Sequence, residues 1–185
     1  DDLLVPIRGK ECTSQQMPVI AQKFPTYLSF AQSDLPGILG KDIESAMQYK
    51  AHLFSSVILV NENGRFTVKR LPTDAQLSAV TGIIVEDFNK DGKKDILLAG
   101  NKFDVEVETT AADASPGLLM VGLGDYNFKC LKSFESGFHV PYNVKDIQSI
   151  RTNDDVVIVV GINNEPLRIF STQRPRTDAG LALVK

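Results

Sequence analysis

The stretch GIIVEDFNKDGKKDILLAGN, residues 82–101, sets a polar loop between two apolar segments. The flanking segments 83–85 and 96–99 are short, and they are rich in Ile, Val and Leu, a pattern typical of buried strands. We therefore predict a strand, a reversing loop and a second strand. Short apolar segments separated by polar turns recur further along the chain, which favours a mainly β fold.

Oxygen-bearing side chains stand at alternate positions of this loop, and they are Asp87, Asn89, Asp91 and Asp95. A loop that turns back tightly directs alternate residues toward one centre, and the Lys93 carbonyl is available there. Hard oxygen donors of this kind suit Ca²⁺, which takes six to eight oxygens. Gly92 permits the positive φ that the reversal needs. The spacing predicts a Ca²⁺ site, and an Asp-Gly hairpin turn with solvated charges is the alternative.

The loop is not an EF-hand. Its twelfth position is Leu98, where an EF-hand carries a bidentate Glu, and strands rather than helices flank it. The corresponding later loop, residues 150–155, lacks the alternation of oxygen donors, so we predict no metal there.

Strand patterns continue on both sides of this unit. Segments 56–60 and 66–68 surround Asn63-Gly64, the strongest short hairpin signal, and further strands are predicted at 117–121, 144–150, 156–160 and 167–170. Helical spacing occurs at 27–31 and from Asp42 to His52, which predicts a small helical insertion. Leu3-Leu4-Val5 is typical of the end of an earlier strand.

Two parts of the β region match at an offset of about 61 residues, with 57–59 corresponding to 118–120 and 97–100 to 158–161. This pattern indicates a partial β-propeller, with about two to three blades of four-stranded antiparallel sheet. Two similar hairpins in a sandwich are the alternative. An incomplete ring needs its remaining blades from the parent chain or from another copy.

The predicted organisation has five parts. They are the end of a preceding blade with a loop (1–22), a helical insertion (23–53), a blade with the calcium loop (54–116), a second blade without one (117–172) and a tail or closing strand (173–185).

The strand–DxNxDGxxD–strand arrangement resembles the calcium loop of the FG-GAP/VCBS repeat family, the β-propeller repeats also found in integrin α-subunits. The segments RGKECTSQQMP, SFAQSDLPGILG and DASPGLL are similar to the C-terminal part of bacterial surface or secreted proteins with such repeats. The resemblance implies Ca²⁺ held by Asp87, Asn89, Asp91, Asp95 and the Lys93 carbonyl. It also implies an extracytoplasmic location, at the cell surface, in the periplasm or in the medium.

Composition excludes several classes of protein. The 185 residues are 43% apolar, with 20 Lys and Arg against 23 Asp and Glu, a formal charge of −3. This balance argues against nucleic acid as a partner, and no apolar run is long enough for a membrane span in this chain. Cys12 and Cys130 leave two buried thiols or one disulfide as alternatives.

The sequence lacks GxSxG, HExxH and P-loop patterns. We therefore expect a non-enzymatic, calcium-binding repeat segment that supports recognition of a protein or a carbohydrate. Phe103, Tyr126 and Tyr142 are loop aromatics that could contact such a ligand, or simply pack. A polysaccharide-active hydrolase or lyase on the propeller face and a purely architectural segment are the alternatives.

Overall fold

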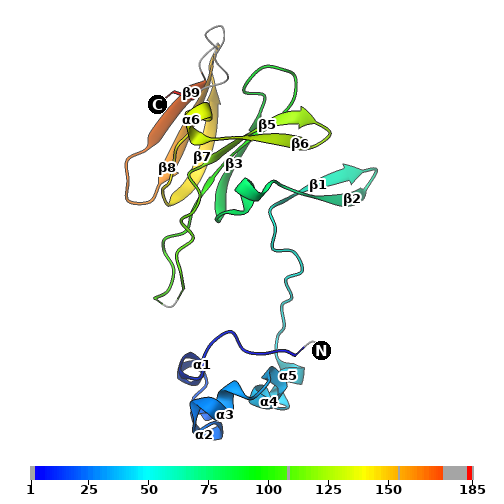
Figure 1. The fold of residues 1–185 in the computed structure, drawn as a ribbon, viewed down its shortest axis with the longest axis vertical. Coiled ribbons are helices and arrows are strands. Elements are labelled where there is room, and N and C mark those ends of the chain that lie inside the picture. Colours follow the sequence, from blue (N-terminus) through cyan, green and yellow to red (C-terminus); the bar gives the residue numbers. More distant parts are fainter. Residues whose placement is uncertain (1–2, 108, 154, 173–182, 185) are drawn as a thin grey trace. The chain divides into compact units, whose positions relative to one another are not determined.

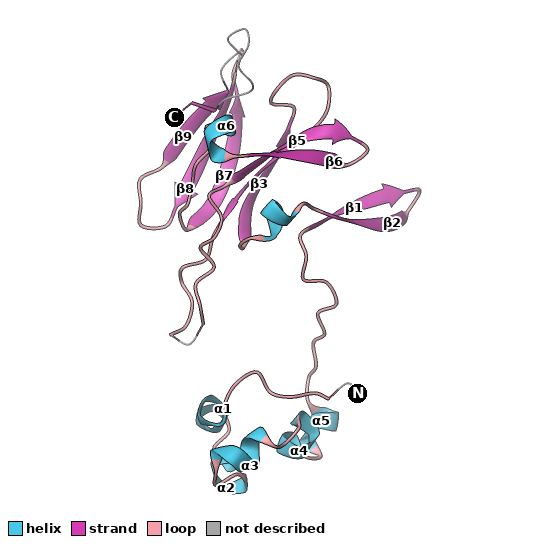
Figure 2. Cartoon of the chain, viewed as in Figure 1, coloured by secondary structure: helices cyan, strands magenta, loops and turns pink. Residues whose placement is uncertain are grey.

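The computed structural model describes residues 3–107, 109–153, 155–172 and 183–184. The chain divides into two compact units, Asp1–His52 and Leu53–Lys185. Helices are the regular structure described in the first unit, and antiparallel strands dominate the second, as Figure 2 shows. The prediction of a mainly β fold with a small helical part is confirmed.

Five short helices make up the N-terminal unit (Figure 1): α1 (Lys10–Gln16), α2 (Val19–Lys23), α3 (Tyr27–Ala31), α4 (Leu35–Leu39) and α5 (Asp42–Ser45). Side-chain caps start two of them. The Thr26 hydroxyl accepts a hydrogen bond from the Ser29 amide at 3.1 Å, and the Asp34 carboxylate accepts one from the Gly37 amide at 2.7 Å. A small core holds the unit together, made of Ile20, Phe24, Phe30 and Ile38.

The sequence-based division of this unit is wrong in two places. Residues 1–22 are not a strand end and loop, because α1 and α2 lie there and the described chain before Val57 contains no strand. The helix expected from Asp42 to His52 ends at Ser45. Met47 and Tyr49 are more than four-fifths exposed, so no core holds the remainder of that stretch in a helix.

The second unit begins with a two-stranded sheet, β1 (Val57–Glu62) and β2 (Arg65–Arg70). Asn63 and Gly64 connect the strands with φ of 54° and 87°, so the predicted hairpin turn is confirmed. A short 3₁₀ turn, η1 (Thr73–Gln76), follows.

Two further antiparallel sheets complete the unit (Figure 1). The first has the order β3-β4-β5-β6, with β3 (Val80–Glu86), β4 (Asp95–Gly100), β5 (Leu118–Gly124) and β6 (Asn127–Leu131). The second follows a short helix, α6 (Ser133–Ser136), and has the order β10-β9-β8-β7, with β7 (Val144–Arg151), β8 (Val156–Ile162), β9 (Arg168–Thr172) and β10 (Leu183–Val184). The predicted tail at 173–185 lies mostly outside the described residues.

Strand pairing corrects the predicted blade boundary at residues 116 and 117. β4 pairs with β5, with Leu97 opposite Leu119, so strands assigned to two separate blades belong to one sheet. The β1–β2 hairpin, assigned to the same blade as β4, forms its own sheet. Each hairpin is predictable from local spacing, but the β4–β5 pair joins strands across the connection 101–117, which no local signal marks.

The sheets pack against one another through the two faces of β4, which is buried along its whole length. On one face, β3, β4 and β5 contact the β7–β9 sheet through a core that includes Leu97, Leu119, Ile147 and Phe170. On the other face, a second core contains Ile96 and Met120, with Ile58 of β1 packed against it. The three sheets do not close into a ring within the described residues, so the propeller stays a prediction.

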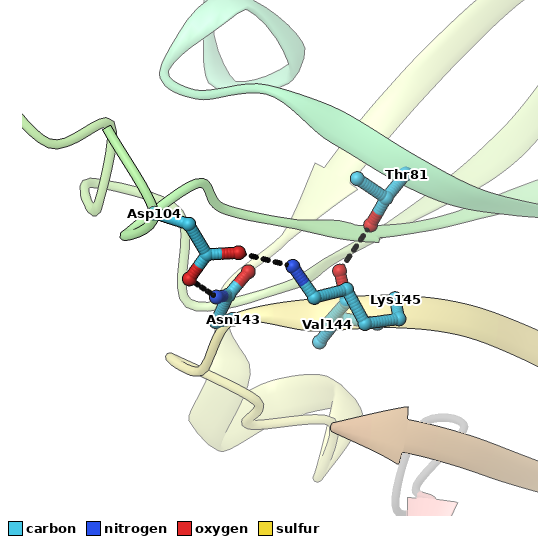
Figure 3. Close-up of polar contacts among 5 residues, drawn as sticks. All are labelled: Thr81, Asp104, Asn143, Val144 and Lys145. Atoms are coloured by element: carbon cyan, nitrogen blue, oxygen red, sulfur yellow. Dashed lines mark hydrogen bonds and ion pairs between the residues drawn. The ribbon is translucent and has the colours of Figure 1, made fainter. Parts of the chain in front are cut away.

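Polar contacts also join the two large sheets, as Figure 3 shows. The Asp104 carboxylate, in the loop after β4, accepts hydrogen bonds from Asn143 Nδ2 at 2.8 Å and from Lys145 Nζ at 2.6 Å. The Thr81 hydroxyl of β3 donates to the Val144 carbonyl of β7 at 2.6 Å. The hydrogen bond from Lys145 is the main reason that the pKa of Asp104 lies below its ordinary value.

The described helices are four to seven residues long, and none has the length and apolar character that a bilayer span requires. Cys12 and Cys130 are both half-buried thiols, in different units.

Candidate calcium loop

Four of the five predicted metal ligands lie in the loop that joins β3 to β4, and the fifth lies at the start of β4. Asp87 follows the last residue of β3, and Asp95 is the first residue of β4. The chain reverses through two residues with positive φ, Lys90 at 61° and Gly92 at 85°. The expectation for Gly92 is confirmed. No signal in the sequence marked Lys90, which adopts a conformation that a residue with a side chain rarely takes.

The first three predicted metal-ligand side chains accept hydrogen bonds from backbone amides of the loop. The Asp87 carboxylate accepts from the amides of Asp91 at 3.1 Å and Gly92 at 2.9 Å. The Asn89 side-chain oxygen accepts from the Asp91 amide at 3.0 Å, and the Asp91 carboxylate accepts from the Lys93 amide at 2.8 Å. The side chains of Asp87, Asn89 and Asp91 thus accept hydrogen bonds from amides of their own loop.

Local hydrogen bonds stabilise the charge of Asp91. The hydrogen bond from the Lys93 amide, followed by that from the Asn89 side chain, holds the pKa of Asp91 below its usual value. The Asp91 side chain is fully exposed, so this shift reflects local hydrogen bonding rather than a buried environment. A carboxylate that stays ionised at neutral pH is the form that binds a cation.

Asp95 has a different position from the other ligands. Its side chain is completely buried, and its two oxygens accept from the Phe88 amide at 2.9 Å and the Gly122 amide at 2.8 Å. Burial raises the pKa of Asp95, and the hydrogen bonds from Gly122 and Phe88 oppose that shift. This residue therefore ties the start of the loop and β5 to β4, a structural role that the sequence analysis missed.

Close backbone packing supports that arrangement. A Cβ atom on Gly122 would lie 2.2 Å from the Lys94 carbonyl oxygen, so only glycine fits this point of β5. A buried Asp at the head of the otherwise apolar segment Asp95–Gly100 is the signal from which its structural role could have been suspected.

The donors fit a hard cation in kind, because they are carboxylate, amide and carbonyl oxygens. Among the described residues, however, no three His, Cys, Asp or Glu side chains gather closely enough to form a metal centre. Asp95 turns to the interior, and the Asp87 and Asp91 oxygens face loop amides. A cation would therefore depend on the Asn89 side chain and the Lys93 carbonyl as well as on carboxylates.

A polar cavity of about 280 Å³ adjoins the loop, between β3 and the β7–β8 connection. Glu86 lies in it and accepts hydrogen bonds from the guanidinium of Arg151, whose Nε is 3.3 Å from Oε1 and whose second nitrogen contacts the other oxygen. In the β7–β8 connection, the Thr152 hydroxyl accepts from the Asp155 amide at 3.0 Å. That turn is stabilised by a hydroxyl where the calcium loop uses carboxylates.

The loop aromatics lie in different environments. Tyr142 packs against the main core with Arg168 over its ring, 5.2 Å from the ring centre. Tyr126 is more than half exposed, in the turn between β5 and β6. That turn places Tyr126 beside Lys93 and Lys94 of the β3–β4 loop along one cavity.

No family model matches the chain, and neither a curated protein nor a solved structure matches it.

Proposed function

We propose that the chain is a non-enzymatic, calcium-stabilised segment of a β-propeller related to the FG-GAP/VCBS repeats, and that it supports recognition of a protein or carbohydrate outside the cytoplasm. The carrying observation is the loop between β3 and β4, where the side chains of Asp87, Asn89 and Asp91 accept hydrogen bonds from loop amides and the backbone has two residues with positive φ. A bound Ca²⁺ would neutralise the mutual repulsion of the Asp87 and Asp91 carboxylates.

The residues of the chain have separate roles in this proposal. Asp87, Asn89 and Asp91 would bind the ion with the Lys93 carbonyl, and Asp95 would hold the loop against β5. Extracellular calcium is millimolar, so a weak site would be filled there. This is the support for an extracytoplasmic location.

The packing of the sheets supports a blade-like arrangement. β3 and β7 are each the first strand of their sheet in the sequence, and each has a register shift near its start. The shift lies between Val80 and Gly82 in β3 and between Val144 and Asp146 in β7. The three sheets follow one another as layers in chain order. Successive blades of a propeller pack in this way.

Both ends of the stack leave apolar side chains uncovered. On β1 and β2, Leu59 lies opposite Val68, and both are more than half exposed. On the far sheet, Ile169 of β9 is likewise more than half exposed and lies opposite Val159 of β8. We propose that further sheets of the same kind cover these faces, in the parent chain or in another copy.

One contact supports a binding role over a hydrolase or lyase. Glu86 of β3 lines the polar cavity beside the loop and is not one of the predicted metal ligands. Its carboxylate is bound by the Arg151 guanidinium. An ion pair of this kind occupies both oxygens of the carboxylate, so neither oxygen is free to contact a substrate.

Calorimetry on chelated protein tests the proposal. With a dissociation constant near 10 µM, 1 mM CaCl₂ would stabilise the β unit by about 2.7 kcal/mol and raise its melting temperature by roughly 8 °C. Asp91→Ala removes an exposed ligand and should abolish that rise. Asp155→Ala, in the corresponding β7–β8 connection, is the matched control and should keep it. An equal response of both variants would overturn the proposal.

A further inference from the structure

The turn between β5 and β6 holds an aromatic ring in a backbone conformation that bulky residues avoid. Asp125 and Tyr126 have φ of 50° and 58°. Asp is common in this left-handed region, but Tyr is a genuine outlier there. The ring is 53% exposed, so burial of the ring does not compensate for the strain. Strained residues of this kind concentrate at ligand sites.

Lys69 of β2 keeps this ring in place. Its Nζ donates a hydrogen bond to the Asp125 carbonyl and lies 5.7 Å from the centre of the Tyr126 ring. The contact joins the β1–β2 hairpin to the β5–β6 turn. Lys69 is thus a positioning residue, which holds the aromatic face at a fixed place between two sheets.

Two cavities adjoin each other at Tyr126. One of about 340 Å³ extends toward Lys93 and Lys94, and the other, of about 440 Å³, extends toward Arg70 on β2. They share one wall, made of Tyr126, Asn127 and Phe128. Both volumes are in the range of small-molecule sites. Together they form a continuous surface with an aromatic centre, which we call the Tyr126 platform.

The charge of this surface is opposite to that of the chain. Its cationic residues are Lys69, Arg70, Lys93 and Lys94, and its carboxylate is that of Asp125. The whole chain has a formal charge of −3. A local positive patch on an acidic protein favours an anionic ligand.

We propose that the Tyr126 platform binds an acidic polysaccharide, a chain of uronate-bearing sugars. The Tyr126 ring offers a flat face for the apolar side of a sugar ring, and the Asn127 amide can bond hydroxyls. Arg70 and Lys94, one in each cavity, can pair with successive carboxylates along the chain. The inference rests on the proposed recognition function and specifies its ligand class.

Other anionic polymers fit these observations less well. Nucleic acid carries a phosphate at every nucleotide and binds mainly through many phosphate contacts, and a patch of four cations around one aromatic ring offers few of them. An acidic peptide would use the cations but has no need of a strained, exposed ring. A glycan uses the ring, the amide and the cations together.

Titration calorimetry with an oligogalacturonate on the full chain tests this proposal, with a neutral galacto-oligosaccharide of equal length for comparison. The parent should bind the acidic sugar at least about tenfold more tightly than the neutral one, and binding should weaken in high salt. Tyr126→Gly removes the ring and relieves the strain. We expect an unchanged or higher melting temperature with affinity about tenfold lower. The control Phe134→Ala removes an exposed aromatic that lines neither cavity and should leave affinity unchanged.

Charge variants complete the test. Arg70→Gln and Lys94→Gln should each weaken binding about threefold or more, whereas Lys129→Gln, on β6 outside both cavities, should not. Equal binding of the neutral sugar, tighter binding of oligo(dT) or polyglutamate, or full affinity in Tyr126→Gly would each overturn the platform. If the parent binds the glycan but shows no calcium response, only the proposed calcium site is overturned. If it shows the calcium response but does not bind the glycan, only the proposal for the Tyr126 platform is overturned.

Discussion

Asp95 and Gly122 are joined by a hydrogen bond of 2.8 Å, from the Gly122 amide of β5 to the completely buried carboxylate at the start of β4. The other oxygen of Asp95 accepts from the Phe88 amide. One side chain thus holds the calcium loop and two strands in register. The position of the loop therefore depends on the sheet.

Replacement of Asp95 should be strongly destabilising with or without calcium. Asp95→Ala leaves the amides of Phe88 and Gly122 buried without an acceptor, at a cost of about 2–4 kcal/mol in the free energy of unfolding. Urea denaturation in the presence of a chelator measures it. Asp91→Ala, at an exposed position of the same loop, should cost less than about 1 kcal/mol under those conditions. Similar losses for the two variants would contradict the assigned roles.

A methyl group at position 122 should not be tolerated. Gly122→Ala places Cβ against the Lys94 carbonyl oxygen, and since that oxygen is a backbone atom and Cβ is fixed directly to the backbone of β5, the backbone must shift. We expect a loss of about 2–4 kcal/mol in stability, measured by urea denaturation. Gly124→Ala is the control, because no atom lies within 4 Å of a Cβ there and only its positive φ of 96° opposes the change. Its loss should be about 1 kcal/mol.

Stability should fall in acid partly through Asp104. Its pKa is lowered in the folded chain, so its contribution is present above the unfolded value, near 3.8, and is lost as pH falls through the lower folded value. Thermal melts between pH 7 and 2 should show this loss in the parent. In Asp104→Asn the decline below about pH 4 should be shallower. An unchanged profile would mean that the contacts of Asp104 with Lys145 and Asn143 do not persist in solution.

The uncovered sheet faces should make the isolated chain self-associate. Phe66 on β2 and Ile169 on β9 are each more than half exposed on an outer face. Phe66→Lys and Ile169→Lys should each reduce association in sedimentation experiments without lowering the melting temperature. Phe134→Lys changes a still more exposed residue on α6 and should have no effect. Association that survives both outer-face variants would argue against these faces as contact surfaces.

Much of the candidate site was predictable because its signals are local. The alternation of Asp87, Asn89 and Asp91 marked the side chains that accept hydrogen bonds within one loop, and Gly92 marked the reversal. The role of Asp95 was not predictable from spacing, because its partner Gly122 lies 27 positions away in the sequence. The strain at Tyr126 was also hidden, since Tyr is not a residue that favours positive φ.

Local patterns alone determined the β class, the Asn63-Gly64 hairpin and the place of the polar loop, because turns and strand alternation depend on near neighbours. The tertiary structure decided which hairpins share a sheet, since β4 pairs with β5 across a long connection that apolar spacing does not specify. It also decided that α1 and α2 belong to a separate helical unit, where Ile20 and Phe24 contribute to a small core. Pairing and packing between distant segments are cooperative, and no short window of sequence contains both partners.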